Sequence, residues 1–185
     1  MTSRSNRTEI RITGFGGQGV ILAGIIIGRA ASIYNNKFAT LTQSFGPEAR
    51  GSACSAGVIV SESKITYPYV TKPEILLTMS QEACNRFLPE TTDDAILLIE
   101  EDLVKPNDLK PGITVYGIPA TRLAEELGRK MILNIVMVGF FTSVTKIVDY
   151  EAARAAVKAS VPPGTEGMNL KAFDRGFEYG TELAH

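Results

Sequence analysis

A glycine-rich segment near the N-terminus has the composition and spacing of an anion-binding loop. In "ITGFGGQGVILAG" (12–24), Gly14, Gly16 and Gly19 stand at the spacing G-x-G-x-x-G, between an apparent strand and an apparent helix. Glycines permit a tight turn and let the backbone approach a ligand closely, and the N–H groups at the start of the following helix carry partial positive charge. The segment therefore favours binding of a phosphate, a pyrophosphate or a carboxylate.

A dinucleotide is the first ligand to consider for this spacing, but the sequence lacks the rest of that site. NAD-binding proteins place an acidic residue about 20 positions after the glycines, at the end of the second strand, where it binds the adenosine ribose. The corresponding segment here, residues 38–43, reads FATLTQ and has no carboxylate or arginine. Glu48 comes later, inside a loop, and Gly17 adds a glycine where dehydrogenases usually carry a side chain. Two alternatives therefore stay open. One is that the chain is a stand-alone NAD(P)- or flavin-dependent oxidoreductase, and the other is that the loop is only a tight turn from strand to helix.

A second loop rich in glycine and proline follows the second predicted strand. The segment "SFGPEARGS" begins at Ser44 and includes Arg50, whose planar guanidinium can form two parallel hydrogen bonds to a phosphate or to a partner's carboxylate. A loop in this position lies at the carboxyl ends of the strands, beside the glycine loop, where open α/β sheets bind ligands. The alternative is a solvated loop held by a Glu48–Arg50 pair. Two adjacent loops of this kind favour a ligand site or a subunit contact.

The remaining composition argues against most catalytic chemistry within this chain. Its 185 residues are 44% hydrophobic and 21% charged, as in ordinary globular domains, and the net charge of −1 gives no reason to expect nucleic acid or an anionic membrane as a partner. The only histidine is His185, and Cys54 and Cys84 are far apart, which argues against a histidine triad, a His-ligated metal site, a CxxC pair and a self-contained iron–sulfur cluster. Both cysteines are expected to be small buried side chains. The polar N-terminus and the short apolar runs predict neither a secretory signal nor a membrane span, so a cytoplasmic location is expected.

Strands and helices alternate along the chain, which predicts that both loops lie at one edge of a mostly parallel sheet. Strands are expected at residues 9–15, 37–43, 74–80, 95–101 and 113–119. Helices are expected at residues 17–34, 81–90, 121–128, 134–147, 150–161 and 168–183, with Asn134 as an N-cap. Residues 53–63 and 64–70 alternate and turn, which predicts a β-hairpin. The expected fold is α/β and Rossmann-like: a mostly parallel sheet flanked by helices, with this hairpin inserted after strand two, in a single domain over residues 1–185.

The motifs, in this order and spacing, resemble those of a known family. "GFGGQGVILAG", followed by "QSFGPEARGSACSAGVIVS", closely resembles the gamma subunit of the 2-oxoacid:ferredoxin oxidoreductases, the pyruvate, 2-oxoglutarate and 2-oxoisovalerate enzymes. "NIVMVGFF" is similar to the Asn-containing helix start of that family, and the resemblance runs from Ile10 to about Leu183.

The resemblance implies that the chain is one subunit of a larger enzyme. Such an enzyme oxidatively decarboxylates a 2-oxoacid, here 2-oxoglutarate on overall resemblance, forms an acyl-CoA and reduces ferredoxin. Thiamine diphosphate, Mg²⁺ and the iron–sulfur clusters are expected in the partner subunits, which are alpha, beta and, in some forms, a ferredoxin-like delta subunit. The gamma subunit is associated with coenzyme A and with packing against alpha, and the isolated chain is expected to be inactive.

The resemblance and the chemistry of the two loops together define one set of candidate residues. These candidates for coenzyme A binding are Gly14, Gly16, Gly17, Gln18, Gly19, Ser44, Phe45, Gly46, Pro47, Glu48 and Arg50. No catalytic residue and no metal ligand is expected in this chain. Ser80, Gln81 and Arg122 follow predicted strand ends and are further candidates for site or subunit contacts, whereas residues 134–144, apolar on nearly all sides, are expected in the core or in a subunit interface. A purely structural scaffold, whose glycine loop meets only protein, is the other alternative.

Overall fold

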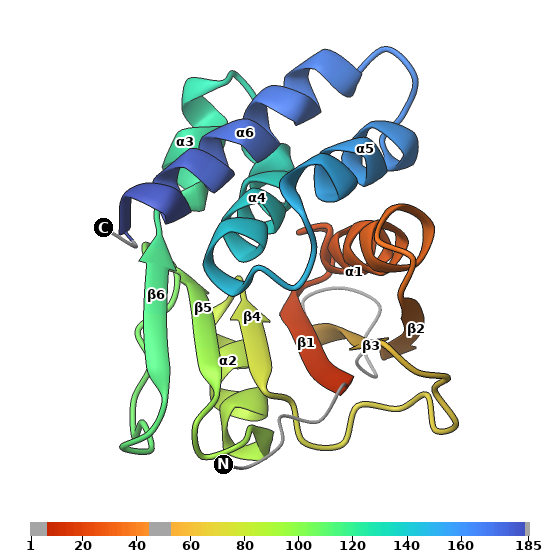
Figure 1. Ribbon diagram of the computed structural model, residues 1–185. Helices are drawn as coiled ribbons and strands as arrows, with labels where there is room; N and C mark the ends of the chain where they lie inside the picture. The colour runs from red at the N-terminus through yellow and green to blue at the C-terminus, as the bar shows by residue number, and fades with distance from the viewer. Residues whose placement is uncertain (1–6, 45–52, 184–185) are drawn as a thin grey trace.

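The computed structural model describes residues 7–44 and 53–183, in which six strands form one sheet with helices on both faces (Figure 1). The strands are β1 (Arg7–Phe15), β2 (Phe38–Ser44), β3 (Ala53–Ser61), β4 (Ile75–Thr78), β5 (Ile96–Glu100) and β6 (Thr114–Ile118). The helices are α1 (Val20–Arg29), α2 (Gln81–Phe87), α3 (Ala120–Glu126), α4 (Leu133–Thr145), α5 (Tyr150–Ser160) and α6 (Glu166–Leu183). A π-helical turn (Ala30–Tyr34) extends α1, and short 3₁₀ turns form at Leu88–Glu90 and Lys130–Ile132. The α/β fold predicted from the sequence is confirmed.

The strand order of the sheet is β2-β3-β1-β4-β5-β6. The four strands β1, β4, β5 and β6 run parallel, and β3 runs antiparallel to both of its neighbours. All four residues of β4 are buried, as expected for an apolar strand in a parallel sheet that is covered on both faces. The parallel strands therefore end at one common edge, where the glycine loop follows β1.

The inserted segment differs from the predicted hairpin, which is not confirmed. Residues 53–61 form β3, but residues 64–70 form no strand. Since β3 lies between β1 and β2, pairing with β1 along its whole length and with β2 from Ser55 to Ser61, it has a neighbour on both sides without a second arm. Pro68, which lacks an N–H group for a ladder, lies beside β2 instead, where its carbonyl oxygen accepts a hydrogen bond from Thr40 Oγ1 (3.2 Å).

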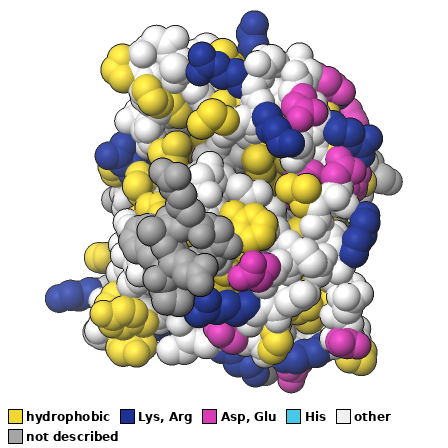
Figure 2. Space-filling view, turned by 180° about the vertical axis from the view of Figure 1, so that it is seen from behind, with side chains coloured by type: hydrophobic (Ala, Val, Ile, Leu, Met, Phe, Trp, Pro, Cys, Tyr) yellow, Lys and Arg dark blue, Asp and Glu magenta, His cyan; other side chains and the backbone are white. Residues whose placement is uncertain are grey.

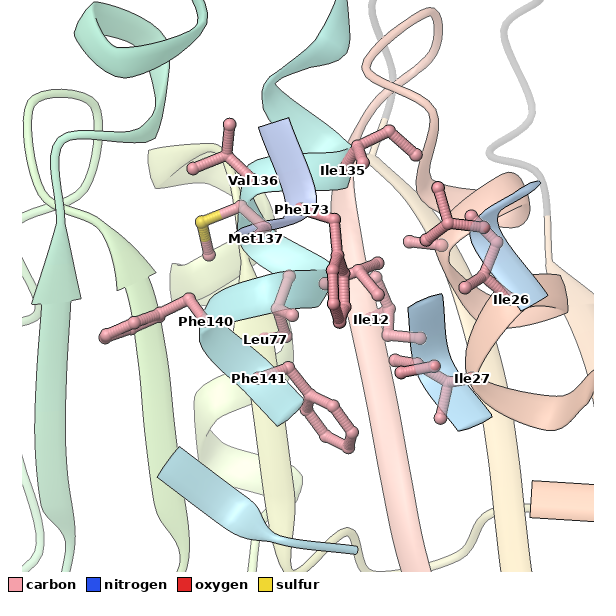
Figure 3. Close-up of a cluster of buried hydrophobic side chains, with 14 of the residues drawn as sticks. Ile12, Ile26, Ile27, Leu77, Ile135, Val136, Met137, Phe140, Phe141 and Phe173 are labelled. Carbon is pink, nitrogen blue, oxygen red and sulfur yellow. The ribbon is translucent and has the colours of Figure 1, made fainter. Parts of the chain in front are cut away.

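The core lies mainly between the sheet and the layer formed by α1, α3, α4, α5 and α6, whereas α2 alone among the labelled helices lies on the other face (Figure 1). Every residue from Leu133 to Ser143 of α4 is buried, because sheet and helices surround it. Residues 134–144, predicted as core or interface, therefore belong largely to the core. Figure 3 shows this cluster of side chains from the sheet, α1, α4 and α6: Ile12, Ile26, Ile27, Leu77, Ile135, Val136, Met137, Phe140, Phe141 and Phe173.

Two glycines let α4 and α6 cross at close range. A Cβ atom added at Gly139 would overlap the carbonyl group of Phe173, and one added at Gly176 would overlap that of Val136. Only residues without a side chain allow two helix backbones to approach this closely. This contact fixes α6 over α4, and α4 in turn lies over the parallel strands.

Candidate functional site

The glycine loop turns the chain from β1 into α1 within four residues. The N–H group of Gln18 donates to the carbonyl oxygen of Phe15 (3.1 Å), and Gly17 and Gly19 have φ angles of 95° and 74°, which L side chains rarely adopt. Helix α1 begins at Val20 and has no acidic residue in its first turn. The strand–turn–helix unit is thus formed as the sequence predicted, while the binding of an anion at its helix N-terminus stays a prediction.

Gln18 holds this loop in place through its side chain. Its Oε1 accepts a hydrogen bond from the N–H group of Phe15 (2.6 Å), and its Nε2 donates to the carbonyl oxygen of Met79 (2.9 Å), just beyond β4. Both ends of the amide are used within the chain. Gln18, predicted as a ligand-binding residue, therefore positions the loop against the neighbouring strand.

Gly19 is covered by Asn134 from the first turn of α4. The Asn134 Nδ2 donates to the Gly19 carbonyl oxygen (3.2 Å), and a Cβ atom at Gly19 would collide with the Asn134 amide. Asn134 was predicted as the N-cap of its helix. Helix α4 in fact begins at Leu133, and its N-cap residue is Ile132. The prediction of an N-cap was wrong because the side chain bonds to a distant loop instead of its own helix.

The four loop glycines divide into two kinds. A Cβ atom at Gly14 would lie 2.6 Å from Gln18 Oε1, and Gly19 is blocked by Asn134, so these two glycines serve close packing inside the chain. Gly16 and Gly17 are exposed, and a Cβ atom at either would meet nothing within 4 Å. The part of the loop open to another molecule is therefore the Gly16–Gly17 backbone, beside the partly exposed Phe15 side chain.

The second candidate loop begins at the same edge of the sheet. Ser44 ends β2 opposite Ser55 of β3, and Ser55 lies opposite Thr13 of β1, next to Gly14. Ser44 is exposed and separated from β1 by a single strand. The candidates Phe45, Gly46, Pro47, Glu48 and Arg50 lie outside the described residues, and their role in a site stays a prediction.

The three further candidates at this edge all have partners within the chain. Ser80 is buried and caps α2, since its Oγ accepts a hydrogen bond from the N–H group of Ala83 (3.3 Å). Gln81 Oε1 accepts from the N–H group of Lys105 (2.7 Å). Arg122 is an exposed side chain whose Nε donates to Asp102 Oδ2 (2.7 Å). All three positions have a local structural role.

Glu100 is a buried carboxyl group at this edge that the sequence did not point out. It ends β5 with no exposed surface, and its Oε1 accepts a hydrogen bond from the N–H group of Thr121 (3.3 Å), while Oε2 has no partner within the described residues. Burial raises the pKa of Glu100, and the nearby Asp102 carboxylate raises it further, against the Thr121 hydrogen bond. The available signal was a glutamate directly after the apolar run of β5.

The described residues hold few groups for redox or metal chemistry. Cys54 and Cys84 are free and buried, as expected, and burial raises the pKa of both thiols. Within residues 7–44 and 53–183, no three His, Cys, Asp or Glu side chains are grouped so that they could hold a metal ion. No helix in the same residues is long and apolar enough to cross a membrane.

The sheet topology adds a reason against a dinucleotide. In dinucleotide-binding sheets the acidic residue for the ribose ends the strand adjacent to β1. Here β3 separates β2 from β1, so the end of β2 lies about 10 Å from β1, at two strand spacings. In addition, β2 carries no carboxylate. The loop therefore has the glycines of a dinucleotide site but no position for its acidic residue.

The fold and the site define an α/β protein whose Rossmann-like glycine loop is open to another molecule at Gly16–Gly17 but is not built for a dinucleotide. Comparison with known proteins places this architecture in a family. The model of the family described as pyruvate ferredoxin/flavodoxin oxidoreductase matches residues 9–179, and the chain belongs to this family. The resemblance stated from the motifs is thus confirmed.

Several relatives match most of the length of this chain. A protein of Methanocaldococcus jannaschii named 2-oxoglutarate synthase subunit KorC is 47% identical over 179 residues, which cover 96% of both chains. The crystal structure of the gamma subunit of keto/oxoacid ferredoxin oxidoreductase from Geobacter sulfurreducens is 38% identical, with a TM-score of 0.84, and covers 96% of this chain and 99% of that one. The structure of 2-oxoglutarate:ferredoxin oxidoreductase from Magnetococcus marinus with 2-oxoglutarate, coenzyme A and succinyl-CoA bound has the same fold. It shows a TM-score of 0.84 at 18% identity, over 97% of this chain and 32% of that longer chain.

Proposed function

We propose that this chain is the gamma subunit of a 2-oxoglutarate:ferredoxin oxidoreductase. The observation that carries the proposal is the 47% identity, over 96% of both chains, to a 2-oxoglutarate synthase subunit. The assembled enzyme oxidatively decarboxylates 2-oxoglutarate, forms the acyl-CoA and reduces ferredoxin. On this proposal residues 1–185 act as a single gamma-type domain in a cytoplasmic enzyme.

The chemistry of electron transfer belongs to the partner subunits in this proposal. Alpha and beta subunits, with a ferredoxin-like delta subunit in some forms, hold thiamine diphosphate, Mg²⁺ and the iron–sulfur clusters. The sequence of the present chain supports this division, because it contains two cysteines, fewer than one cluster needs, and one histidine. Its own contribution is packing against the alpha subunit and part of the coenzyme A site.

The glycine loop is the proposed contact with coenzyme A. Gly16 and Gly17 leave open space where side chains would otherwise stand, and the start of α1 follows directly without an acidic residue. A pyrophosphate fits such a helix start, since backbone N–H groups and the helix dipole both favour negative charge. Gly14, Gln18 and Gly19 shape the loop from behind, while Ser44 and residues 45–50, with the Arg50 guanidinium, would approach from the second loop.

Activity of the reconstituted enzyme tests the function. Coexpressed with its alpha and beta partners, the chain is expected to support coenzyme A-dependent reduction of ferredoxin with 2-oxoglutarate, at a higher kcat/KM than with pyruvate or 2-oxoisovalerate. The chain alone should show no turnover. Reduction of ferredoxin by the isolated chain, or a preference for pyruvate, would contradict the proposal.

Two substitutions test the coenzyme A contact. Gly16→Asp places a negative charge at the open part of the loop and should raise the KM for coenzyme A about tenfold or more, with the KM for 2-oxoglutarate unchanged. Arg50→Ala should act in the same direction. Gly167→Asp, in the first turn of α6 where a Cβ atom also meets nothing, is the matched control and should leave both KM values unchanged. Equal KM values for coenzyme A in all variants would favour the purely structural scaffold.

A further inference from the structure

The face of the sheet that carries α2 has a groove beside that helix. Its volume is about 420 Å³, and it lies between α2 and the β1–β3–β2 side of the sheet. Arg11, Gly57 and Thr42 stand side by side across these three strands and line it. The side chain of Val70 packs closely over Gly57, where an added Cβ atom would lie 2.9 Å from Val70 Cγ2, and Val70 also lines the groove. Figure 2 shows this face, on which basic and acidic side chains adjoin below the centre.

The groove carries one positive charge that no carboxylate among the described residues neutralises. Arg11 forms an ion pair with Glu90, which is the only carboxylate along the described lining. The guanidinium of Arg86 lies over the Phe87 ring, 5.0 Å from its centroid, and no carboxylate pairs with it within residues 7–44 and 53–183. Arg11 lies against the same ring at 5.1 Å. The Phe87 ring therefore holds both guanidinium groups at the groove, and that of Arg86 is free to bind an anion.

Polar side chains line the strand side of the groove. Ser55, which lines the groove, is only 6% exposed, and its hydroxyl makes no hydrogen bond within the described part of the chain. Thr42, Gln43 and Ser44 add polar side chains along the neighbouring strand. A ligand in the groove would find hydroxyl and amide groups along these strands with which to form hydrogen bonds.

We propose that this groove is a binding site for a small molecule with one anionic group, a carboxylate or a phosphate ester, whose charged group pairs with Arg86 and whose neutral polar part bonds to Ser55 and Gln43. The guanidinium fork matches the geometry of either anionic group. The volume of the groove is in the range of small-ligand sites, and its single unpaired guanidinium fits a ligand with one anionic group better than a nucleotide with several phosphates. The site does not depend on the proposed function and does not involve the glycine loop.

Titration of the full-length chain tests the proposal with inorganic phosphate, acetate and glycerol 3-phosphate as probes, followed by NMR of the Arg86 side chain and the Ser55 amide. All three should bind in competition, with glycerol 3-phosphate the tightest because only it offers hydroxyl groups to the strands. Arg86→Gln should weaken binding about tenfold or more, and Ser55→Ala several-fold for glycerol 3-phosphate. Arg175→Gln, an exposed arginine on α6, is the matched control and should leave binding unchanged.

The same variants distinguish a small ligand from a partner's side chain. If Arg86→Gln and Arg175→Gln bind the probes equally well, the site is overturned. Phosphate binding is also compared between the isolated chain and the assembled enzyme. If the isolated chain binds phosphate but the assembled enzyme does not, and Arg86→Gln weakens assembly, the groove receives a carboxylate of another subunit. The small-ligand proposal is then wrong. Binding that persists in the assembled enzyme and depends on Arg86 supports it.

Discussion

The side-chain amide of Asn134 donates a hydrogen bond to the carbonyl oxygen of Gly19, with 3.2 Å between Nδ2 and O, and so joins the start of α4 to the start of α1. The two residues are 115 positions apart in the sequence. Through this contact the most buried helix of the core supports the loop that we propose for coenzyme A. Loop geometry and core packing are therefore coupled.

Asn134→Ala should lower the free energy of unfolding by about 1–2 kcal/mol, because Asn134 is buried and the Gly19 carbonyl loses a partner. Urea denaturation of the isolated chain measures this loss. Asn107→Ala, at an exposed position, should change the free energy of unfolding by less than about 0.5 kcal/mol. Equal stability of the two variants would show that the Asn134–Gly19 bond contributes nothing.

Gly19→Ala should destabilise the protein by about 2 kcal/mol or more, since the position has a φ of 74° and the new methyl group would collide with Asn134. Gly16→Ala should leave the stability nearly unchanged, because its Cβ atom would enter open space. Thermal unfolding of both variants tests the difference. The double variant Gly19→Ala/Asn134→Ala should lose less than the sum of the single losses, because the collision is removed. Strict additivity would argue against the contact.

Gly176→Ala should be among the most damaging single substitutions, costing about 3 kcal/mol or more, because its methyl group would overlap the Val136 carbonyl and push α6 away from α4. Gly167→Ala, on the same helix with nothing within 4 Å, should be neutral or slightly stabilising. Circular dichroism and denaturant titration of the two variants provide the comparison. A mild effect at Gly176 would mean that the two helices can separate cheaply.

Stability should fall as the pH rises through the titration of Glu100. Burial raises the pKa of this carboxyl above its ordinary value near 4.5, so the folded protein keeps a proton that the unfolded chain has already released. The unfolded state then binds fewer protons than the folded state, and the free energy of unfolding decreases from about pH 4.5 up to the raised pKa. In Glu100→Gln this loss disappears, so the stability of the variant relative to the wild type should increase with pH across that window.

Urea denaturation between about pH 4 and pH 8 measures the Glu100 contribution. Glu126→Gln, at an exposed position of α3, is the control and should track the wild type at every pH. If the free energies of unfolding of Glu100→Gln and the wild type differ by the same amount at every pH, Glu100 titrates alike in the folded and unfolded states.

Most of the elements could be predicted from local patterns. The apolar runs that became β4 and β5, and Gly128 with its φ of 91° at the end of α3, are signals that lie within a few residues. The glycine loop is also local, because its turn requires residues that tolerate positive φ at Gly17 and Gly19. The family followed from two such motifs in order, and the match over residues 9–179 confirms it.

The roles of individual site residues could not be read in the same way. Gln18 carries the type and position of a ligand-binding residue, yet both ends of its amide bond to the Phe15 and Met79 backbone. Asn134 has the type of an N-cap, yet it bonds to Gly19. Each outcome depends on a strand or helix that comes from elsewhere in the chain.

The sequence by itself determined the α/β class, the turn from β1 into α1 and the absence of an acidic residue at the end of β2, because these depend on residue type and short spacing. Only the tertiary structure decided that β3 runs between β1 and β2, that Glu100 is buried, and that Gly16 and Gly17 alone among the loop glycines face open space. The physical reason is that strand pairing and burial are set by which distant surfaces fit together. Local patterns do not contain that information.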